Sequence, residues 1–155
     1  MALINGENWP WRRVFSNRCR ESRYNFFVMT SHDTFDDPAA LSARFVSAFN
    51  AGDLNRLDAL YEERGVVVPV PGHAVAGPGR SAANRHLLGL GLPMTAETRR
   101  VYVADDIALL LVDWSLNGTG PDGREVAMKG TATDVVRRGA DGTWRYVIDN
   151  PHGIA

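Results

Sequence analysis

Apolar residues early in the patterned part of the chain recur at helical spacing. Leu41, Phe45 and Phe49 lie four residues apart, which predicts an amphipathic helix that begins near Asp37. Asp37 is a favourable N-cap, and Pro38 suits the first helical position because its missing N–H group costs nothing there. An Asn-Ala-Gly-Asp turn then ends this helix and begins a second one. The second helix is expected to carry Leu54, Leu57, Leu60 and Tyr61.

The second half of the chain is rich in β-branched and aromatic residues and predicts strands. Turns of only a few residues separate these strands, and such short turns join antiparallel neighbours. A four-stranded antiparallel meander is therefore expected. Gly130 lies inside the longest strand and predicts a β-bulge that lets the sheet curl. The four predicted strands span about residues 97–104, 107–117, 124–138 and 143–149.

The segment between the two halves predicts three shorter elements. Residues 66–70 are a Val-rich strand, and Pro69 places it toward a sheet edge because proline cannot donate to a ladder. Residues 71–79 predict a loop or a short hairpin, and residues 80–90 predict a third helix whose Arg80 lies at the surface. Since helices and antiparallel strands are segregated along the chain, the fold class is α+β.

The first 35 residues show no sustained periodicity, so we expect the domain to comprise residues 36–155. Residues 1–28 contain five arginines against two glutamates and lack the apolar stretch of a secretory signal. Met29 opens a normal lead-in to the first helix. Residues 1–35 are therefore interpreted as an N-terminal extension, either a flexible arm or a non-native start upstream of Met29.

Composition narrows the class of protein without identifying a function. The hydrophobic share is 45% and the formal net charge is −1, so we expect neither nucleic acid nor a membrane surface as a partner. Cys19 is the single cysteine and cannot form an intrachain disulfide. No apolar run approaches the roughly 18–20 residues that span a bilayer. These features favour a soluble, cytoplasmic protein.

The usual cofactor and metal motifs do not occur in the sequence. The four histidines lack the spacing of zinc sites, and there is no cysteine pair. The glycine-rich stretches match neither a P-loop nor a dinucleotide fingerprint, and no Gly-x-Ser-x-Gly elbow offers a serine nucleophile. We therefore expect no metal and no cofactor, and acid–base chemistry by carboxylates and imidazoles is what remains.

Two stretches resemble a known superfamily. AFNAGDLNRLDALY near the start and the DG-x-W-x-x-x-x-DNP ending are similar to the nuclear transport factor 2-like superfamily, and most similar to its SnoaL-like, ketosteroid-isomerase-like bacterial members. The resemblance covers about residues 36–153. It implies a cystatin-like cone, in which a curved antiparallel sheet wraps around N-terminal helices and leaves an apolar pocket. It also implies homodimers through the outer face of the sheet. Members include isomerases, dehydratases, epoxide hydrolases and polyketide cyclases.

The resemblance implies a catalytic aspartate after the first strand, as in ketosteroid isomerase, but this chain departs from that pattern. The corresponding stretch, VVVPVPGH, has no carboxylate, and His73 is the only titratable residue there. His73 is therefore a catalytic candidate, and steroid-isomerase chemistry is disfavoured.

Aspartates in the meander are the other catalytic candidates. Asp113 lies in a strand with two largely apolar faces, where a carboxylate needs a partner or a proton. It is either paired to an arginine such as Arg99 or Arg137, or functional. Asp134 has the same ambiguity.

The chain ending places a carboxylate, an amide and an imidazole where the last strand stops. Alternation puts Asp149 on the sheet face opposite Trp144 and Tyr146, and Pro151 ends the pairing. Either Asp149 and Asn150 form a structural Asx-turn, or Asp149 is a base at the pocket mouth that meets Asp113. In the second case Asn150 and His152 contact the ligand.

Trp114 and Tyr61 complete the predicted ligand-binding set, although aromatic residues on strands more often belong to a core or an interface. The pattern favours a small-molecule isomerase, cyclase or dehydratase that acts on an apolar carbonyl compound. The alternatives are a non-catalytic ligand-binding protein and a dimerisation module of the same fold. The expected partners are a small apolar molecule and a second copy of the chain.

Overall fold

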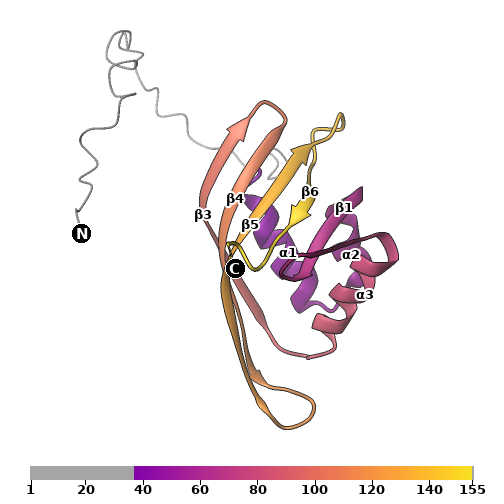
Figure 1. The fold of residues 1–155 in the computed structure, drawn as a ribbon, viewed down its shortest axis with the longest axis vertical. Coiled ribbons are helices and arrows are strands. Elements are labelled where there is room, and N and C mark those ends of the chain that lie inside the picture. Colours follow the sequence, from indigo (N-terminus) through magenta and orange to yellow (C-terminus); the bar gives the residue numbers. More distant parts are fainter. Residues whose placement is uncertain (1–36, 155) are drawn as a thin grey trace, which may run out of the picture. The chain divides into compact units, whose positions relative to one another are not determined.

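A computed structural model describes residues 37–154 of the chain. The prediction for residues 1–35 lies outside the described residues. The described part is α+β, with three helices against one side of a six-stranded curved sheet (Figure 1). The predicted fold class, a cystatin-like α+β fold, is confirmed.

All three predicted helices form, although their ends differ from the prediction; the third begins at Gly77 rather than at residue 80. They are α1 (Ala40–Asn50), α2 (Leu54–Ala59) and α3 (Gly77–Leu88). The N-cap of α1 is Ala39, so the prediction that Asp37 caps this helix and that Pro38 is its first residue is wrong. The Asp37 carboxylate instead accepts a hydrogen bond from the Ala39 N–H at 2.9 Å, in the turn before α1. Asp53 caps α2 by accepting from the Arg56 N–H at 2.9 Å. Helix α1 turns Leu41 and Phe49 into the core, as its four-residue spacing predicts.

One predicted helical residue belongs to a strand instead. Helix α2 ends at Ala59, and Tyr61 begins strand β1 (Tyr61–Val70). The reason is a long-range pairing: Tyr61 lies opposite Tyr146, and the Tyr146 N–H donates to the Leu60 carbonyl at 2.8 Å. This backbone pairing holds Tyr61 in the sheet despite its helix-compatible spacing from Leu57.

The sheet is mixed because β1 runs parallel to the last strand. The remaining strands are β2 (His73–Ala76), β3 (Met94–Ala104), β4 (Ile107–Thr119), β5 (Glu125–Arg138) and β6 (Trp144–Asp149). Their order in the sheet is β2-β1-β6-β5-β4-β3. The antiparallel meander β3-β4-β5-β6 is confirmed. Of the predicted loop or hairpin at residues 71–79, the part up to Ala76 forms a hairpin with β1, and residues 77–79 belong to α3.

Two predictions about strand irregularities are wrong. Pro69 does not mark an edge strand, since β1 lies between β2 and β6; proline is tolerated because the β1–β2 register breaks between Val67 and Val70. Gly130 makes no bulge, because the β4–β5 register runs through it without a shift. A Cβ at Gly130 would lie 3.0 Å from the Trp114 Nε1 atom and 3.1 Å from the Pro151 carbonyl oxygen, so glycine leaves room for these two groups.

Two apolar clusters pack between the helices and the sheet. One joins Leu41 of α1 to the inward-facing residues of β1, β4, β5 and β6, and the other joins Phe49 and Leu57 to Leu116. Inward positions of β4 alternate with exposed ones, as its two-residue period requires. No helix within residues 37–154 is long and apolar enough to cross a membrane.

Candidate functional site

A cavity of about 600 Å³ lies between the helices and the concave side of the sheet. Its volume is that of typical small-molecule sites. The wall is largely apolar, and the polar side chains on it are few. The polar lining residues are Ser42, Asn84, His86, Trp114, Asp134, Tyr146, Asp149 and His152, and the apolar ones include Phe45, Leu87, Met94, Val112 and Met128.

Two carboxyl groups, Asp134 and Asp149, line this cavity from neighbouring strands. Asp134 shares a face of β5 with Ala132 and Val136, and it is 3% exposed. Asp149 is the last residue of β6 and is partly buried. A buried pair of carboxyl groups in an apolar cavity cannot easily ionise twice.

A β-bulge explains how Asp149 reaches the cavity. Val135 pairs with Ile148 while Val136 pairs with Tyr146, so Val147 is the extra residue in β6. Strict alternation places Asp149 on the face opposite Tyr146, and that prediction is wrong. The bulge reverses the alternation, so that both Tyr146 and Asp149 line the cavity.

Burial raises the pKa of Asp149 from its ordinary value of 3.8 to about 6, and a hydrogen bond from the Tyr61 hydroxyl partly offsets this rise. Burial also raises the pKa of Asp134 well above its ordinary value, and the negative charge of Asp149 adds to that rise. The Asn150 N–H, which donates to Asp134 Oδ1 at 3.0 Å, acts in the opposite direction. Ionisation of Asp149 therefore favours the protonated form of Asp134, and the two carboxyl groups do not ionise independently.

The Tyr61 phenol does not line the cavity, but three contacts hold it beside Asp149. Its hydroxyl donates to Asp149, its ring lies 5.2 Å from that of Tyr146, and the Arg80 guanidinium lies 4.6 Å from its centroid. Burial raises the Tyr61 pKa, and the Asp149 charge raises it further. Tyr61 is therefore a neutral donor that orients the Asp149 carboxylate.

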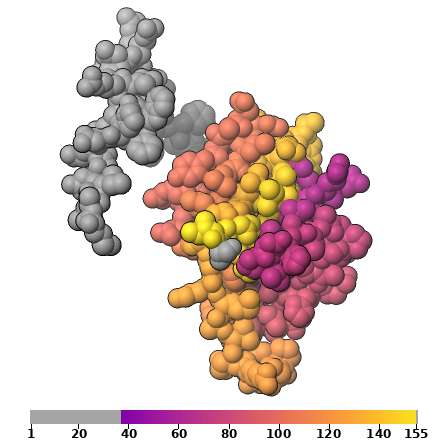
Figure 2. All heavy atoms as spheres, viewed as in Figure 1, coloured from indigo at the N-terminus to yellow at the C-terminus, as the bar shows by residue number. Residues whose placement is uncertain are grey.

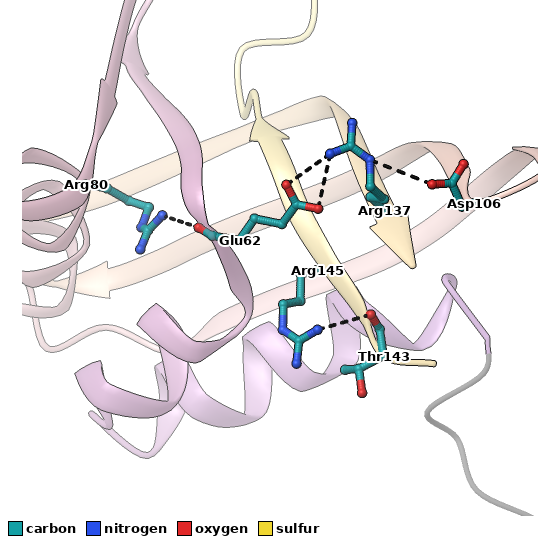
Figure 3. A network of polar contacts seen from close by, with 6 residues as sticks. All are labelled: Glu62, Arg80, Asp106, Arg137, Thr143 and Arg145. Atoms are coloured by element: carbon teal, nitrogen blue, oxygen red, sulfur yellow. Dashed lines mark hydrogen bonds and ion pairs between the residues drawn. The ribbon is translucent and has the colours of Figure 1, made fainter. Parts of the chain in front are cut away.

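Arg80 is buried at 7% exposure, so its predicted place at the surface is wrong. Its Nη1 donates to the Glu62 carbonyl oxygen at 3.0 Å (Figure 3) and to the Gly65 carbonyl oxygen at 2.7 Å, and these bonds tie α3 to β1. Glu62 in turn pairs with Arg137 at 3.2 Å. Among the described residues, no lysine or arginine lines the cavity.

The Asp-Asn-Pro-His-Gly ending folds into a turn that ties three strands together. The Asn150 side-chain amide donates to the Gly153 carbonyl at 2.7 Å and to Thr133 Oγ1 at 3.2 Å. The Trp114 indole N–H donates to the Pro151 carbonyl at 2.9 Å. His152 Nε2 lies 3.1 Å from the Pro69 carbonyl oxygen, so the yellow C-terminal residues lie against β1 in Figure 2.

The structure brings some predicted site residues to the cavity and places others elsewhere. Asp149, His152 and Trp114 line it, whereas Tyr61 does not line it and instead donates a hydrogen bond to Asp149. Asn150 is absent from its lining, and its amide is engaged by the turn. His73 is exposed on β2 and does not line it.

Asp113 does not meet Asp149, because it lies on the outer face of the sheet. It pairs with Arg99 at 3.4 Å and accepts a hydrogen bond from Thr131 at 2.6 Å. This is the arginine pairing that the sequence left open as the alternative to a functional role. Asp113 lines a separate outer depression with Thr95, Glu97, Lys129 and Thr131.

Two further buried polar residues of the site, Asp134 and Asn84, can be recognised from the sequence pattern. Asp134 alternates with apolar residues of β5, which puts it on the inward face. Asn84 follows Arg80 by four residues, so both share one side of α3, and Asn84 is 5% exposed. Polar residues at buried positions need partners, and that need marks them as candidates. Within residues 37–154 no group of three or more His, Cys, Asp or Glu could hold a metal ion.

Comparison with known proteins identifies the fold family. The family model of the SnoaL-like domain matches residues 42–147. No curated protein matches the sequence. Several solved structures have the same fold at low identity, so the likeness concerns the fold alone.

One similar structure is a nuclear transport factor 2-like protein of unknown function in nutrient uptake from Rhodospirillum rubrum, with 23% identity, a TM-score of 0.63, and 77% of this chain and 100% of that chain covered. A nuclear transport factor 2-like protein with a cystatin-like fold from Novosphingobium aromaticivorans has 21% identity and a TM-score of 0.61, and the match covers 75% of this chain and 79% of that chain. A protein from Streptomyces avermitilis, provisionally assigned as a dehydratase of the nuclear transport factor 2-like family, has 18% identity and a TM-score of 0.61, and the match covers 74% of this chain and 91% of that chain.

Proposed function

Because the chain belongs to the SnoaL-like domain family, we propose that it is a cofactor-independent enzyme that moves protons on an apolar carbonyl compound. Isomerases, cyclases and dehydratases share this chemistry. One observation carries the proposal: two carboxyl groups with raised pKa values, Asp134 and Asp149, line one largely apolar cavity. Such a pair supplies a base and an acid at the same pH.

The different surroundings of the two groups support different roles. The pKa of Asp149 is about 6, so Asp149 is ionised at neutral pH and is the base that removes a proton from the carbon next to a carbonyl group. Burial and the charge of Asp149 both favour the protonated form of Asp134, which donates a hydrogen bond to the oxygen on which negative charge develops. Return of the proton to another carbon yields an isomer. Transfer of the Asp134 proton to a departing β-hydroxyl group yields an alkene and water.

Tyr61 is a positioning residue in this scheme. Its hydroxyl holds one oxygen of Asp149 and leaves the other oxygen for the substrate. The hydrogen bond also lowers the pKa of Asp149, so that more of the base is ionised at neutral pH. Loss of this bond is therefore expected to move the pH dependence and to leave the chemistry possible.

Deuterium exchange into 2-tetralone in D2O, followed by proton NMR, tests the proposal without knowledge of the natural substrate. We expect the protein to accelerate exchange next to the carbonyl, with a rate that rises through pH 6 because only ionised Asp149 accepts a proton. Asp149→Asn should slow this exchange by roughly 10²–10⁴-fold. Tyr61→Phe should move the rise to higher pH.

Asp113→Asn is the matched control, since Asp113 lies on the outer face of the sheet and should leave exchange unchanged. Exchange at the wild-type rate in Asp149→Asn would refute Asp149 as the base. Binding of 2-tetralone with exchange no faster than in buffer would instead support a non-catalytic ligand-binding protein.

A further inference from the structure

We propose that the Tyr146 hydroxyl holds the carbonyl oxygen of the substrate, so that the Asp134 proton is left for a departing hydroxyl group. The substrate is then a β-hydroxy carbonyl compound, which the protein dehydrates. This inference rests on the proposed function, because it takes Asp149 as the base. It deepens that function by choosing dehydration among the reactions that the acid–base pair allows and by adding a third group to the site.

The first argument is a free hydroxyl group on the buried part of the cavity wall. Tyr146 lines the cavity and is 3% exposed, and no group within residues 37–154 forms a hydrogen bond with its hydroxyl. In this part of the chain, the polar atoms that are closed off without a partner belong to other residues, so the hydroxyl opens to the cavity. Buried polar groups nearly always have partners, and an oxygen of the ligand would supply this one.

The other buried polar side chains on the wall are engaged or closed off. The Ser42 hydroxyl bonds to the Thr98 hydroxyl at 2.7 Å, and the Asn84 nitrogen has almost no accessible surface. Among the described buried residues of the wall, Tyr146 and Asp134 are therefore the two that can donate to a ligand.

The sheet holds the Tyr146 ring beside both carboxyl groups. Tyr146 pairs with Val136 of β5, and Asp134 lies two residues further along the same face, as a diagonal neighbour. The Tyr146 ring lies 5.2 Å from that of Tyr61, whose hydroxyl donates to Asp149. A ligand oxygen bonded to Tyr146 would therefore lie near both carboxyl groups.

The donors differ in whether they can give up a proton. Burial raises the pKa of Tyr146, and the charges of Asp134 and Asp149 raise it further, so the phenol donates a hydrogen bond and keeps its proton. Asp134 is a carboxylic acid and can transfer its proton completely. The Asn150 N–H occupies Oδ1 of Asp134 and leaves Oδ2 for the ligand.

The number of groups favours dehydration over isomerisation. Isomerisation needs a base and one donor at the carbonyl oxygen, and Asp149 with Asp134 would suffice. Dehydration also needs an acid at the departing hydroxyl, because hydroxide is a poor leaving group. One Asp134 proton cannot serve both oxygens at once, and Tyr146 supplies the missing donor.

The proposed step balances in atoms and charge. The Asp149 carboxylate takes a proton from the carbon next to the carbonyl, and the electrons of that bond form the new carbon–carbon double bond. As the bond between the β-carbon and its oxygen breaks, the Asp134 proton goes to that oxygen and water leaves. Tyr146 donates to the carbonyl oxygen while negative charge develops on it. The two carboxyl groups hold one proton before and after the step, and a water molecule returns it from Asp149 to Asp134.

Benzylacetone and its β-hydroxy derivative, the aldol adduct of acetone and benzaldehyde, form a matched pair of probes. They share the ketone, and only the second has a hydroxyl to lose. Proton NMR in D2O follows deuterium exchange next to the carbonyl of benzylacetone. Ultraviolet absorbance follows the conjugated product, benzylideneacetone. We expect the wild type to accelerate both reactions.

Two variants separate the roles of the donors. Tyr146→Phe should slow dehydration by roughly 10²–10³-fold, and it should slow exchange by less, because Asp134 can then serve the carbonyl oxygen. Asp134→Asn should slow dehydration by roughly 10²–10⁴-fold, because an amide cannot give up the proton. It should slow exchange by less than about tenfold, since Tyr146 still holds the carbonyl oxygen. Tyr102, which is 58% exposed on β3, gives the control, and Tyr102→Phe should leave both rates unchanged.

Stability gives an independent readout. Tyr146→Phe keeps the ring and removes only a hydroxyl that has no partner among residues 37–154, so its melting temperature should equal or exceed that of the wild type. A lower melting temperature with unchanged rates would overturn the proposal and make the hydroxyl structural.

The outcomes separate this inference from the proposed function. A wild type that exchanges deuterium into benzylacetone without dehydrating the aldol adduct refutes the inference and leaves the acid–base proposal standing. Release of benzaldehyde in place of benzylideneacetone would show that the base takes the hydroxyl proton, which also refutes dehydration. Wild-type dehydration in Tyr146→Phe refutes Tyr146 as the donor. Absence of both reactions in the wild type refutes the proposed function as well.

Discussion

Replacing Asp149 by asparagine should make the protein more stable at neutral pH, and this gain should disappear in acid. The carboxylate is ionised at pH 7.5 in a cavity that disfavours its charge, so the folded state bears an energetic cost for carrying it. Asparagine has nearly the same shape and can still accept the hydrogen bond from the Tyr61 hydroxyl, but it does not titrate.

The magnitude follows from the pKa. The Asp149 pKa of about 6 in the folded protein lies about 2.2 above its ordinary value of 3.8. Since one pKa unit corresponds to about 1.4 kcal/mol, ionisation of Asp149 lowers the free energy of unfolding by about 3 kcal/mol. Between pH 3.8 and 6 the folded state binds more protons than the unfolded state, so stability falls as pH rises through this range. Above this range the cost is constant.

The Asp134 carboxyl adds to the effect with the same sign. Its pKa is raised partly by the charge on Asp149, so neutralising Asp149 relieves Asp134 as well. The new amide introduces N–H donors that lack built-in partners, and this lowers the net gain at every pH by the same amount. The pH-dependent part of the difference is therefore the sharper quantity, at about 2.5 kcal/mol between pH 4 and pH 7.5.

Urea unfolding followed by circular dichroism, at one protein concentration and at several pH values, measures this difference. The exposed Asp106, which pairs weakly with Arg137, provides the control, and Asp106→Asn should stay within about 0.5 kcal/mol of the wild type at each pH. A difference between Asp149→Asn and the wild type that does not change with pH would refute the raised pKa. A variant less stable at pH 7.5 than at pH 4, relative to wild type, would show that the charge stabilises the fold.

Two further predictions concern the turn after β6 and the outer face of the sheet. Gly153→Ala should lower the free energy of unfolding by roughly 2–4 kcal/mol, because Gly153 has φ of 60° and a Cβ there would overlap the Thr131 carbonyl oxygen. The control Gly142→Ala, with φ of 77° and open space around it, should lower it by only about 1–2 kcal/mol in the same thermal unfolding experiment, and equal losses would refute the steric argument. We also propose a homodimer through the outer sheet face, where the side chains of Tyr102 and its cross-strand partner Leu109 are 58% and 38% exposed. Sedimentation at micromolar concentration should give a mass of about twice 17.0 kDa for the wild type and a monomer mass for Leu109→Lys. A wild-type mass of 17.0 kDa would contradict the dimer.

The elements that sequence reasoning located are those whose determinants are local. The spacing of Leu41 and Phe49, the Asp53 cap and the short turns of the meander each act within a few residues, and the structure follows them. The pairing of β1 with β6 depends on residues more than eighty positions apart. Nothing in the neighbourhood of Tyr61 distinguishes the last residue of a helix from the first residue of a parallel strand, because either assignment buries its ring.

The site was harder to predict than the fold because one inserted residue decides it. Alternation is reliable only while a ladder is regular, and the bulge at Val147 shifts every later residue of β6 to the other face. Residues 144–149 carry no glycine or proline to signal a bulge. For β5 the ladder next to β4 is regular, so alternation would have placed Asp134 in the cavity correctly.

The chain ending also shows that a structural turn and a functional carboxylate are not exclusive alternatives. The Asn150 amide bonds to the Gly153 carbonyl, the His152 ring to the Pro69 carbonyl, and the Trp114 indole N–H to the Pro151 carbonyl. These polar groups of the turn therefore have hydrogen-bond partners other than Asp149. The Asn150 N–H reaches Asp134 instead, so the same turn also fixes the second carboxyl group. Asp149 is consequently positioned by its neighbours rather than by its own backbone contacts, and its oxygens are left to Tyr61 and the cavity. A residue that only stopped the strand would have no reason to stay in an apolar wall with its pKa raised to about 6.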